Sequence, residues 1–269
     1  MGVKSKKERL AAQDYVDQLA SSGRYHFNSH EARAALKVSA DATKLALNRL
    51  SRQGLIAQPA RGFYTVIPPE YRSLGCLPAE QFIPALMTLQ SQTYYVGLLS
   101  AAQYYGSAHH RPQAFQVVLQ KNRRPIHCGK VRVSFIARKR IGEVPVRTFN
   151  TPRGEIRVST PEATAVDIAG YPQHAGGLDG VATVLAELAD SMDANRLPQA
   201  ASTAPLTWAQ RLGFLMGLSE AREKSDPLRA YVQNHAREYT LLSPGHQSTR
   251  KMRVPDWKVI VNAHVEHEL

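Results

Sequence analysis

The stretch SADATKLALNRLSRQGLIAQPARGFYTV, residues 39–66, decides the fold of the amino-terminal part of the chain. Ser39 is a favoured helix N-cap, and Asp41 places a negative charge in the first turn, where the helix dipole stabilises it. An apolar stripe at helical spacing follows, formed by Thr43, Ala46, Leu47 and Leu50. Gly54 stands where a glycine commonly ends a helix. The sequence therefore predicts one helix that begins after Ser39 and ends before Gly54.

Two short strands after this helix predict a β-hairpin. Residues 55–57 and 63–66 are mostly apolar, aromatic or β-branched, and the loop 58–62 between them contains Pro59, Arg61 and Gly62. A hairpin directly behind such a helix is typical of the wing in a winged helix-turn-helix.

Two helices upstream complete this unit. Apolar residues at helical spacing predict a helix over 7–20 that ends near Gly23. Ser29 is expected to cap a second short helix over 30–36, and Lys37-Val38 then forms the turn. The amino-terminal part is thus predicted to be a winged helix-turn-helix.

The polar face of the recognition helix and the wing carry side chains that suit DNA. Lys44, Arg49 and Arg52 can reach phosphates, and Asn48 can present a donor and an acceptor to an adenine edge. Arg61 adds a cation to the wing. We predict that these five residues bind DNA. The alternative is a solvated helix face, but the glycine stop and the basic wing favour DNA binding.

The charge of the chain also indicates a polyanionic partner. Its formal net charge is +12 over 269 residues, and its isoelectric point lies near 9.8. Residues 1–66 hold eleven Lys and Arg against five Asp and Glu. From Gln81 to Gly142 there is no acidic residue, which suggests a second basic surface, formed by Arg123, Arg124, Lys130, Arg132, Arg138 and Arg140. The alternative is that these basic residues lie on the solvent-exposed face of a sheet and bind no partner.

Cysteine usage and hydropathy indicate the cytoplasm. Cys76 and Cys128 are the only cysteines, too few and too far apart for a disulfide framework or a common zinc site. Three lysines near the amino terminus, Lys4, Lys6 and Lys7, have no apolar stretch behind them. Since no run approaches the roughly 18 apolar residues of a membrane span, we expect neither export nor a membrane partner.

The length of the chain fits two domains, and we place the boundary at Pro68-Pro69. Residues 1–67 are the predicted winged helix-turn-helix, and residues 70–269 a larger mixed α+β domain. In the second domain we expect helices within 78–106, an antiparallel meander over 114–158 and, behind the cap Thr160-Pro161-Glu162, further helices. A loop is expected at 200–205 and a final strand at 257–261. The fold class is therefore α+β.

No catalytic constellation emerges from the sequence. Phosphate-binding glycine motifs are absent. The adjacent His109 and His110 cannot easily face one metal, and His264 with His267 lies at a carboxyl terminus that is expected to fray. Glu162 and Asp167, five residues apart on a helix, do not share a face. The pairs Tyr94-Tyr95 and Tyr104-Tyr105 can stack on bases, but their apolar neighbours favour a core position. We predict a protein that is not an enzyme and has no metal and no cofactor.

Four segments resemble the AbiEi family of bacterial antitoxin-repressors, from type IV toxin-antitoxin and abortive-infection systems. They are LNRLSRQGLIAQPARGFY at 47–64, YYVGLLSAAQYYGSAHHRPQAFQVV at 94–118, GEIRVSTPEATAVDI at 154–168 and WKVIVN at 257–262. The resemblance implies that the winged helix represses its own operon by binding an operator in double-stranded DNA, with inverted repeats. It also implies that the carboxyl-terminal domain counteracts a nucleotidyltransferase toxin without forming a stable complex.

The predicted function is therefore that of a DNA-binding repressor and antitoxin. Two alternatives come from other classes of protein. One is a nucleic-acid-processing enzyme in which the second basic surface grips a strand, although such an enzyme would need a carboxylate cluster for its metal. The other is a repressor with a small-molecule sensor domain, whose ligand would release it from DNA.

Overall fold

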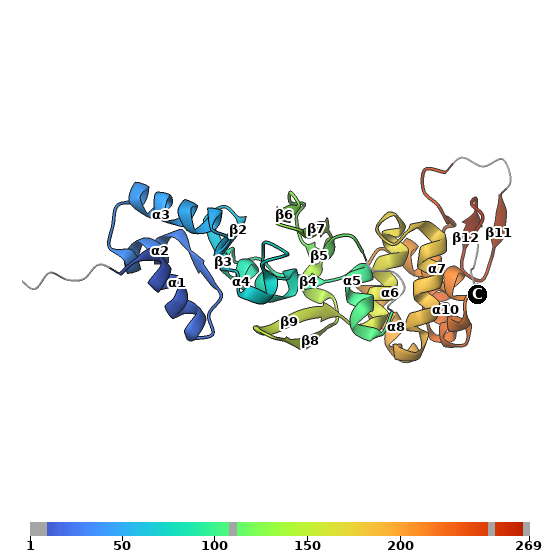
Figure 1. Ribbon diagram of the computed structural model, residues 1–269. Coiled ribbons are helices and arrows are strands. Elements are labelled where there is room, and N and C mark those ends of the chain that lie inside the picture. Colours follow the sequence, from blue (N-terminus) through green and yellow to red (C-terminus); the bar gives the residue numbers. More distant parts are fainter. Residues whose placement is uncertain (1–9, 108–111, 247–250, 266–269) are drawn as a thin grey trace, which may run out of the picture. The chain divides into compact units, whose positions relative to one another are not determined.

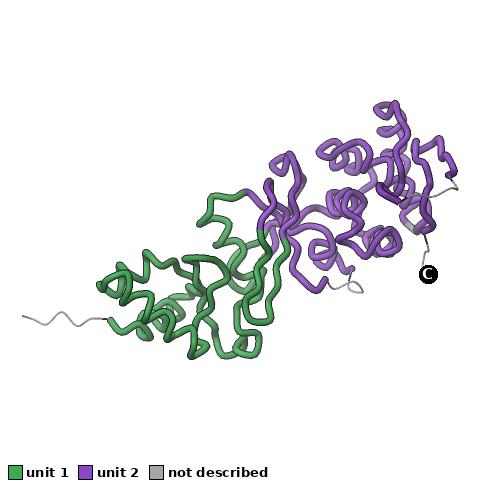
Figure 2. The backbone as a smooth tube through the Cα atoms, turned by 90° about the horizontal axis from the view of Figure 1, so that it is seen from above, with its two compact units in different colours: residues 1–92, 124–134, 150–156 green, residues 93–123, 135–149, 157–269 purple. Residues whose placement is uncertain are grey.

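The computed structural model describes residues 10–107, 112–246 and 251–265 (Figure 1). Several residues considered in the sequence analysis lie outside these ranges: Lys4, Lys6, Lys7, His109, His110 and His267. The chain forms two compact units (Figure 2). Unit 1 comprises residues 1–92, 124–134 and 150–156, and unit 2 comprises residues 93–123, 135–149 and 157–269.

The amino-terminal part of unit 1 is a winged helix-turn-helix, as predicted. Its helices are α1 (Ala12–Ser21), α2 (Ser29–Leu36) and α3 (Ala40–Arg52). Its antiparallel sheet has the order β1-β3-β2, with β1 at His26–Asn28, β2 at Ile56–Ala60 and β3 at Phe63–Val66. Apolar side chains of all three helices and of the sheet form one buried core that includes Val16, Phe27, Leu36, Leu47 and Ile56. The apolar stripes read from the sequence are therefore the faces that pack together.

The ends of the helices follow from short-range hydrogen bonds. Ser39 Oγ accepts the backbone N–H of Ala42 at 3.2 Å, and Gly54 takes a φ of +70° directly after the cap of α3. The prediction of Ser29 as the cap of α2 is wrong by one residue. Asn28 caps the helix instead, because its side chain accepts the N–H of Glu31 while the Glu31 carboxylate accepts the N–H of Asn28.

The wing is tighter than the predicted five-residue loop. β2 continues to Ala60 through a bulge after Ala57, so that only Arg61 and Gly62 form the turn. Gly62 has a φ of +75°, and its carbonyl accepts the backbone N–H of Ser29 at 3.0 Å. The tip of the wing is thereby fixed to the first residue of α2.

Unit 1 continues beyond the predicted boundary between residues 67 and 70. Ile67 is buried, a 3-10 turn spans Pro69–Tyr71, and α4 spans Ala79–Leu89. Later in the chain, β6 (Ile126–Cys128) pairs with the first half of β7 (Val131–Ala137). α4 begins before Pro84 and continues through this proline.

Arg153, in the turn between β8 (Val146–Thr151) and β9 (Gly154–Ser159), also belongs to unit 1. Its guanidinium carbon lies 3.3 Å from the centre of the Tyr25 ring, and its Nε donates to Gln81 Oε1 at 2.8 Å. A residue from the middle of the chain is thus part of the packing of the DNA-binding unit.

The main sheet has six strands in the order β6-β7-β5-β4-β9-β8. β4 (Tyr94–Val96) is antiparallel to β5 (Phe115–Leu119) and parallel to β9, with Val96 opposite Val158. The strands predicted within 114–158 form, but their order as an antiparallel meander is wrong because β4 lies between β5 and β9. The predicted helix across Tyr94–Val96 is also wrong. All three residues of β4 are buried, and a short apolar run of this kind does not distinguish a strand from a helix.

Helices form the bulk of unit 2. They are α5 (Leu98–Ala102), α6 (Pro161–Gly170), α7 (Gly177–Leu188), α8 (Leu197–Ser202), α9 (Leu206–Met216) and α10 (Asp226–His235). α6 packs against α5, α7, α8 and α9, and nine of its ten residues are buried. Thr160 caps α6 as predicted, whereas the loop predicted at 200–205 is partly the helix α8.

A small sheet lies near the carboxyl end of the described residues. Its strands are β10 (Thr240–Leu241), β11 (Met252–Val254) and β12 (Val259–Val261), in the order β10-β12-β11. The strand predicted from Trp257 begins two residues later. Among the helices that the structure describes, none is both long enough and apolar enough to cross a membrane.

Candidate nucleic-acid interface

The five residues predicted to bind DNA are all exposed in unit 1. Lys44, Asn48, Arg49 and Arg52 lie on α3, and Arg61 lies at the tip of the wing. On the opposite side of α3, the side chains of Thr43, Leu47 and Leu50 are buried in the winged-helix core. The helix therefore turns its polar stripe outward because its apolar stripe is held inward.

A groove brings part of this set together. Lys44 and Asn48 line it from α3, Arg61 from the wing, and His30 and Arg33 from α2. Gly62 and Ser29 form its floor near the wing, where the hydrogen bond between their backbones holds the wing against α2. Arg49 and Arg52 lie outside the groove, further along the exposed side of α3.

The cations of this surface are available to an anionic partner. Within the described ranges, Lys44, Arg49, Arg52 and Arg61 form no ion pair with a carboxylate. Their exposed charges can therefore neutralise phosphates and release the counterions that surround DNA. Asn48 stands among them as an amide that can read a base edge.

Sequence reasoning missed three residues of this surface. His30 and Arg33 lie on the outer face of α2, which no pattern marked as part of the groove. Leu45 is 67% exposed in the middle of α3, between the cations. An apolar side chain at that position suits the methyl group of a thymine in the major groove. Leu45 could have been found from the sequence, because it is an apolar residue on the polar stripe of the helix.

Two segments of the chain match known family models, and one of these segments contains this surface. Residues 14–67 match the family model described as a transcriptional regulator, AbiEi antitoxin, and residues 95–218 match the AbiEi antitoxin C-terminal domain. The chain belongs to the AbiEi family of antitoxins. The regulator match covers most of α1 and all of α2, α3 and the wing, so the groove and all five predicted residues lie within it.

A solved structure supports the fold of the whole chain. The crystal structure of RV2827C protein from Mycobacterium tuberculosis matches with a TM-score of 0.67 at 19% identity, over 94% of this chain and 92% of that chain. At this identity the likeness concerns the fold alone. No curated protein matches the chain.

The second basic surface is divided between the units, and one of its six residues is not on a surface. Arg124, Lys130 and Arg132 are exposed in unit 1, while Arg123 is half-buried and Arg140 exposed in unit 2. Arg138 is only 3% exposed, so its assignment to a basic surface is wrong. It points into the core because an acidic partner there neutralises it.

That partner is Asp167 of α6, in the AbiEi C-terminal domain. Arg138 Nε lies 3.2 Å from Asp167 Oδ1, and the two side chains are almost completely buried. Tyr95 donates its hydroxyl to Asp167 Oδ2 at 2.7 Å and accepts from Arg138 Nη1 at 3.2 Å. Arg138 Nη2 donates to Thr203 Oγ1 at 2.9 Å. Four segments far apart in sequence thus meet in one buried polar network.

The network is enclosed in the core of the domain and leaves the side chains of Arg138 and Asp167 almost without contact with solvent. Burial raises the pKa of the Asp167 carboxyl, and the nearby Arg138 charge and the Tyr95 hydroxyl oppose that shift. Burial also raises the pKa of Tyr95 well above its ordinary value. Because Tyr95 is a core residue, the prediction that the tyrosine pairs are structural is confirmed at this position.

Glu162 and Asp167 do not form an acid pair, in agreement with their spacing. Glu162 accepts the backbone N–H of Asp193 at 2.9 Å and is buried, whereas Asp167 belongs to the network with Arg138. In the part of the chain that the structure describes, no group of three or more His, Cys, Asp or Glu side chains could hold a metal ion.

Proposed function

We propose that the chain is an autoregulating repressor and antitoxin of a type IV toxin-antitoxin system that acts in the cytoplasm. Its winged helix would bind an operator in its own operon, and its carboxyl-terminal domain would counteract a nucleotidyltransferase toxin without a stable complex. One observation carries the DNA-binding part. Exposed cations that form no ion pair with any described residue line α3 and the wing, inside the segment that matches an AbiEi transcriptional regulator.

The arrangement of these residues favours double-stranded DNA as the ligand. An exposed helix that carries Lys44, Asn48, Arg49 and Arg52 has the width and polarity to enter a major groove. The wing would place Arg61 against the adjacent backbone or minor groove. Since each winged helix reads one half-site, we propose an operator with inverted repeats that two copies of the chain occupy.

The antitoxin part of the proposal rests on the family match of residues 95–218. Asp167 and Glu162 of that domain are engaged in its core, and we propose no catalytic role for them. The functional division would follow the predicted one, with operator binding in residues 1–67 and neutralisation in residues 70–269.

Point variants of the full chain separate the two activities better than a truncation. Unit 1 extends to Gln92 and includes two later segments, so a fragment that begins at Glu70 would lose part of its own packing. We would change Lys44 and Arg61 together to alanine and measure repression of a reporter under the operon's promoter. In parallel, the variant would be expressed with the nucleotidyltransferase of the same operon and growth scored.

The double variant should lose repression and still rescue growth. Arg196→Ala is the matched control, because it removes an exposed cation of unit 2 that already pairs with Asp193 at 3.3 Å. Full repression by the double variant would show that the DNA surface is elsewhere. Loss of rescue by a double variant that is folded would show that neutralisation needs DNA binding, and the division of roles would be wrong.

A further inference from the structure

The two cysteines of the chain meet in unit 1. Cys76 and Cys128 are 52 positions apart in the sequence. In the structure both are free thiols, both are buried, and they lie close enough for each to shift the pKa of the other. They form no disulfide in the structure, but the packing of the β6-β7 hairpin brings together two cysteines that are far apart in sequence.

The backbone holds the two thiols together. Lys130 donates its backbone N–H to the carbonyl of Leu74 at 2.7 Å. Gly129, next to Cys128, lies so close to the residues before Cys76 that a Cβ there would stand 2.1 Å from the Leu74 carbonyl oxygen. Glycine at 129 thus permits the close approach of the two segments, and the cysteines follow from it as neighbours.

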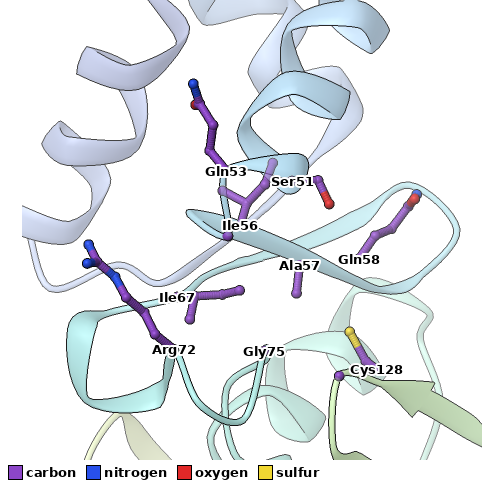
Figure 3. Close-up of a pocket in the computed structure, with 11 residues that line it drawn as sticks. Ser51, Gln53, Ile56, Ala57, Gln58, Ile67, Arg72, Gly75 and Cys128 are labelled. Atoms are coloured by element: carbon purple, nitrogen blue, oxygen red, sulfur yellow. The ribbon is translucent and has the colours of Figure 1, made fainter.

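The two thiols differ in their access to solvent. Cys128 lines a pocket of unit 1 together with Ala57 and Gln58 of β2 and Arg72, and Figure 3 shows its sulfur directed toward β2. Cys76 is completely buried and touches Thr65 Oγ1 at 3.9 Å. A small solute in the pocket would therefore meet Cys128 first, with Cys76 directly behind it.

The hydrogen bonds also distinguish the two thiols chemically. The Cys76 thiol donates to Cys128 and lowers its pKa, and the backbone N–H of Gln58 adds to this effect while burial opposes it. The same hydrogen bond, together with burial, raises the pKa of Cys76. Cys128 is thus the sulfur that more readily becomes a thiolate, the nucleophilic form of cysteine.

We propose that Cys128 and Cys76 form a hydroperoxide-reactive pair that closes to a disulfide. The Cys128 thiolate attacks an oxygen of the hydroperoxide, the O–O bond breaks, and the departing oxygen takes a proton to leave as water or an alcohol. Cys128 is then a sulfenic acid. The Cys76 sulfur attacks it, the S–S bond forms, the S–O bond breaks, and the hydroxide leaves as water with the proton of Cys76.

This reaction is balanced by one oxidant. The two thiols together lose two electrons and two protons, and the hydroperoxide is reduced by the same two electrons. A thiol reductant would reverse the change by thiol-disulfide exchange. A metal site is the weaker interpretation of the pair, because in the described part of the chain no third His, Cys, Asp or Glu ligand joins it.

The test uses the full chain and hydrogen peroxide. The intact mass should fall by two hydrogen atoms, and both thiols should resist iodoacetamide under denaturing conditions until dithiothreitol is added. Because the chain contains no other cysteine, each outcome has a single assignment. Two thiols that still react with iodoacetamide after peroxide treatment would overturn the proposal, as would a disulfide that joins two chains or a gain of two oxygen atoms at Cys128.

Single variants test the order of events. Cys76→Ser should accumulate a sulfenic acid at Cys128 that dimedone traps, since the second sulfur is missing. Cys128→Ser should leave Cys76 unreacted over the same time. Equal oxidation of Cys76 in Cys128→Ser would overturn the assignment of Cys128 as the reactive thiol. The measurement on the parent chain stands even where a variant does not fold.

Discussion

Removal of the positive charge of Arg61 should weaken DNA binding by an amount that depends on salt and not on base sequence. Arg61 is exposed at the wing tip and has no ion-pair partner among the described residues. The change to alanine leaves the turn intact, because the positive φ of +75° belongs to Gly62 and not to Arg61. The variant therefore loses a charge without a change in fold.

The size of the effect follows from the number of available cations. Four cations can each neutralise one phosphate: Lys44, Arg49, Arg52 and Arg61. Each neutralised phosphate contributes about −0.9 to the slope of a plot of log affinity against log salt concentration, so the expected slope is about −3.6 per bound protomer. Arg61→Ala should reduce the slope by about 0.9. When the salt concentration rises from roughly 50 to 200 mM, the fold loss of affinity should then be about 3.5 times smaller for the variant than for the parent.

The assay is a fluorescence anisotropy titration of operator DNA and of a scrambled duplex at several salt concentrations. Arg61→Ala should weaken binding to both duplexes alike, whereas Asn48→Ala should keep the slope and lose about 1–3 kcal/mol of discrimination between them. Arg196→Ala is the charge-matched control and should behave as the parent. A parental slope in Arg61→Ala together with parental discrimination in Asn48→Ala would refute the placement of the recognition surface on α3 and the wing.

Three further predictions concern the fold. Gly62→Val should reduce operator affinity with the winged helix still folded, because a β-branched residue at a φ of +75° costs on the order of 1 kcal/mol or more; equal affinity in a gel shift would contradict this. Gly170→Ala should lower the free energy of unfolding of unit 2 by about 1–3 kcal/mol, since a Cβ there would lie 2.2 Å from the Trp208 ring, while Gly142→Ala, with open space around it, should be neutral in denaturant titrations. Burial lowers the pKa of His26 below its ordinary value of about 6.5, so His26 takes up a proton at a higher pH in the unfolded chain than in the folded one. The stability of unit 1 should therefore fall as the pH drops through about 6.5. His26→Phe should make the melting temperature depend less on pH, measured in thermal melts at about pH 7.5 and about pH 5.5.

The winged helix could be predicted because its signals are local. Ser39, Gly54 and Gly62 each act within a few residues, through a cap, a helix stop and a turn at positive φ. The same holds for Thr160 at the start of α6, which accepts the N–H of Ala163 at 3.3 Å. Such features follow from the immediate sequence, and the structure confirms the helices and strands that they start or end.

The errors concern contacts between distant segments. Arg138 is one of several cations in a basic stretch, and only the fold places it beside Asp167 and Tyr95. The strand Tyr94–Val96 is defined by its neighbours β5 and β9, and its own residues fit a helix equally well. For the same reason the pairing of Cys76 with Cys128 could not be predicted.

Arg153 ties the completion of the DNA-binding unit to a late point in the synthesis of the chain. Its contacts with Tyr25 and Gln81 need residues 150–156, so unit 1 cannot finish packing before residue 156 of 269 has left the ribosome. The packing of Arg153 against Tyr25 and Gln81 is completed only after more than half of the protein is made. Contacts of such long sequence separation slow folding, because the loop between them must close first. A newly made chain would then complete the packing of unit 1 only after most of its main sheet has been synthesised.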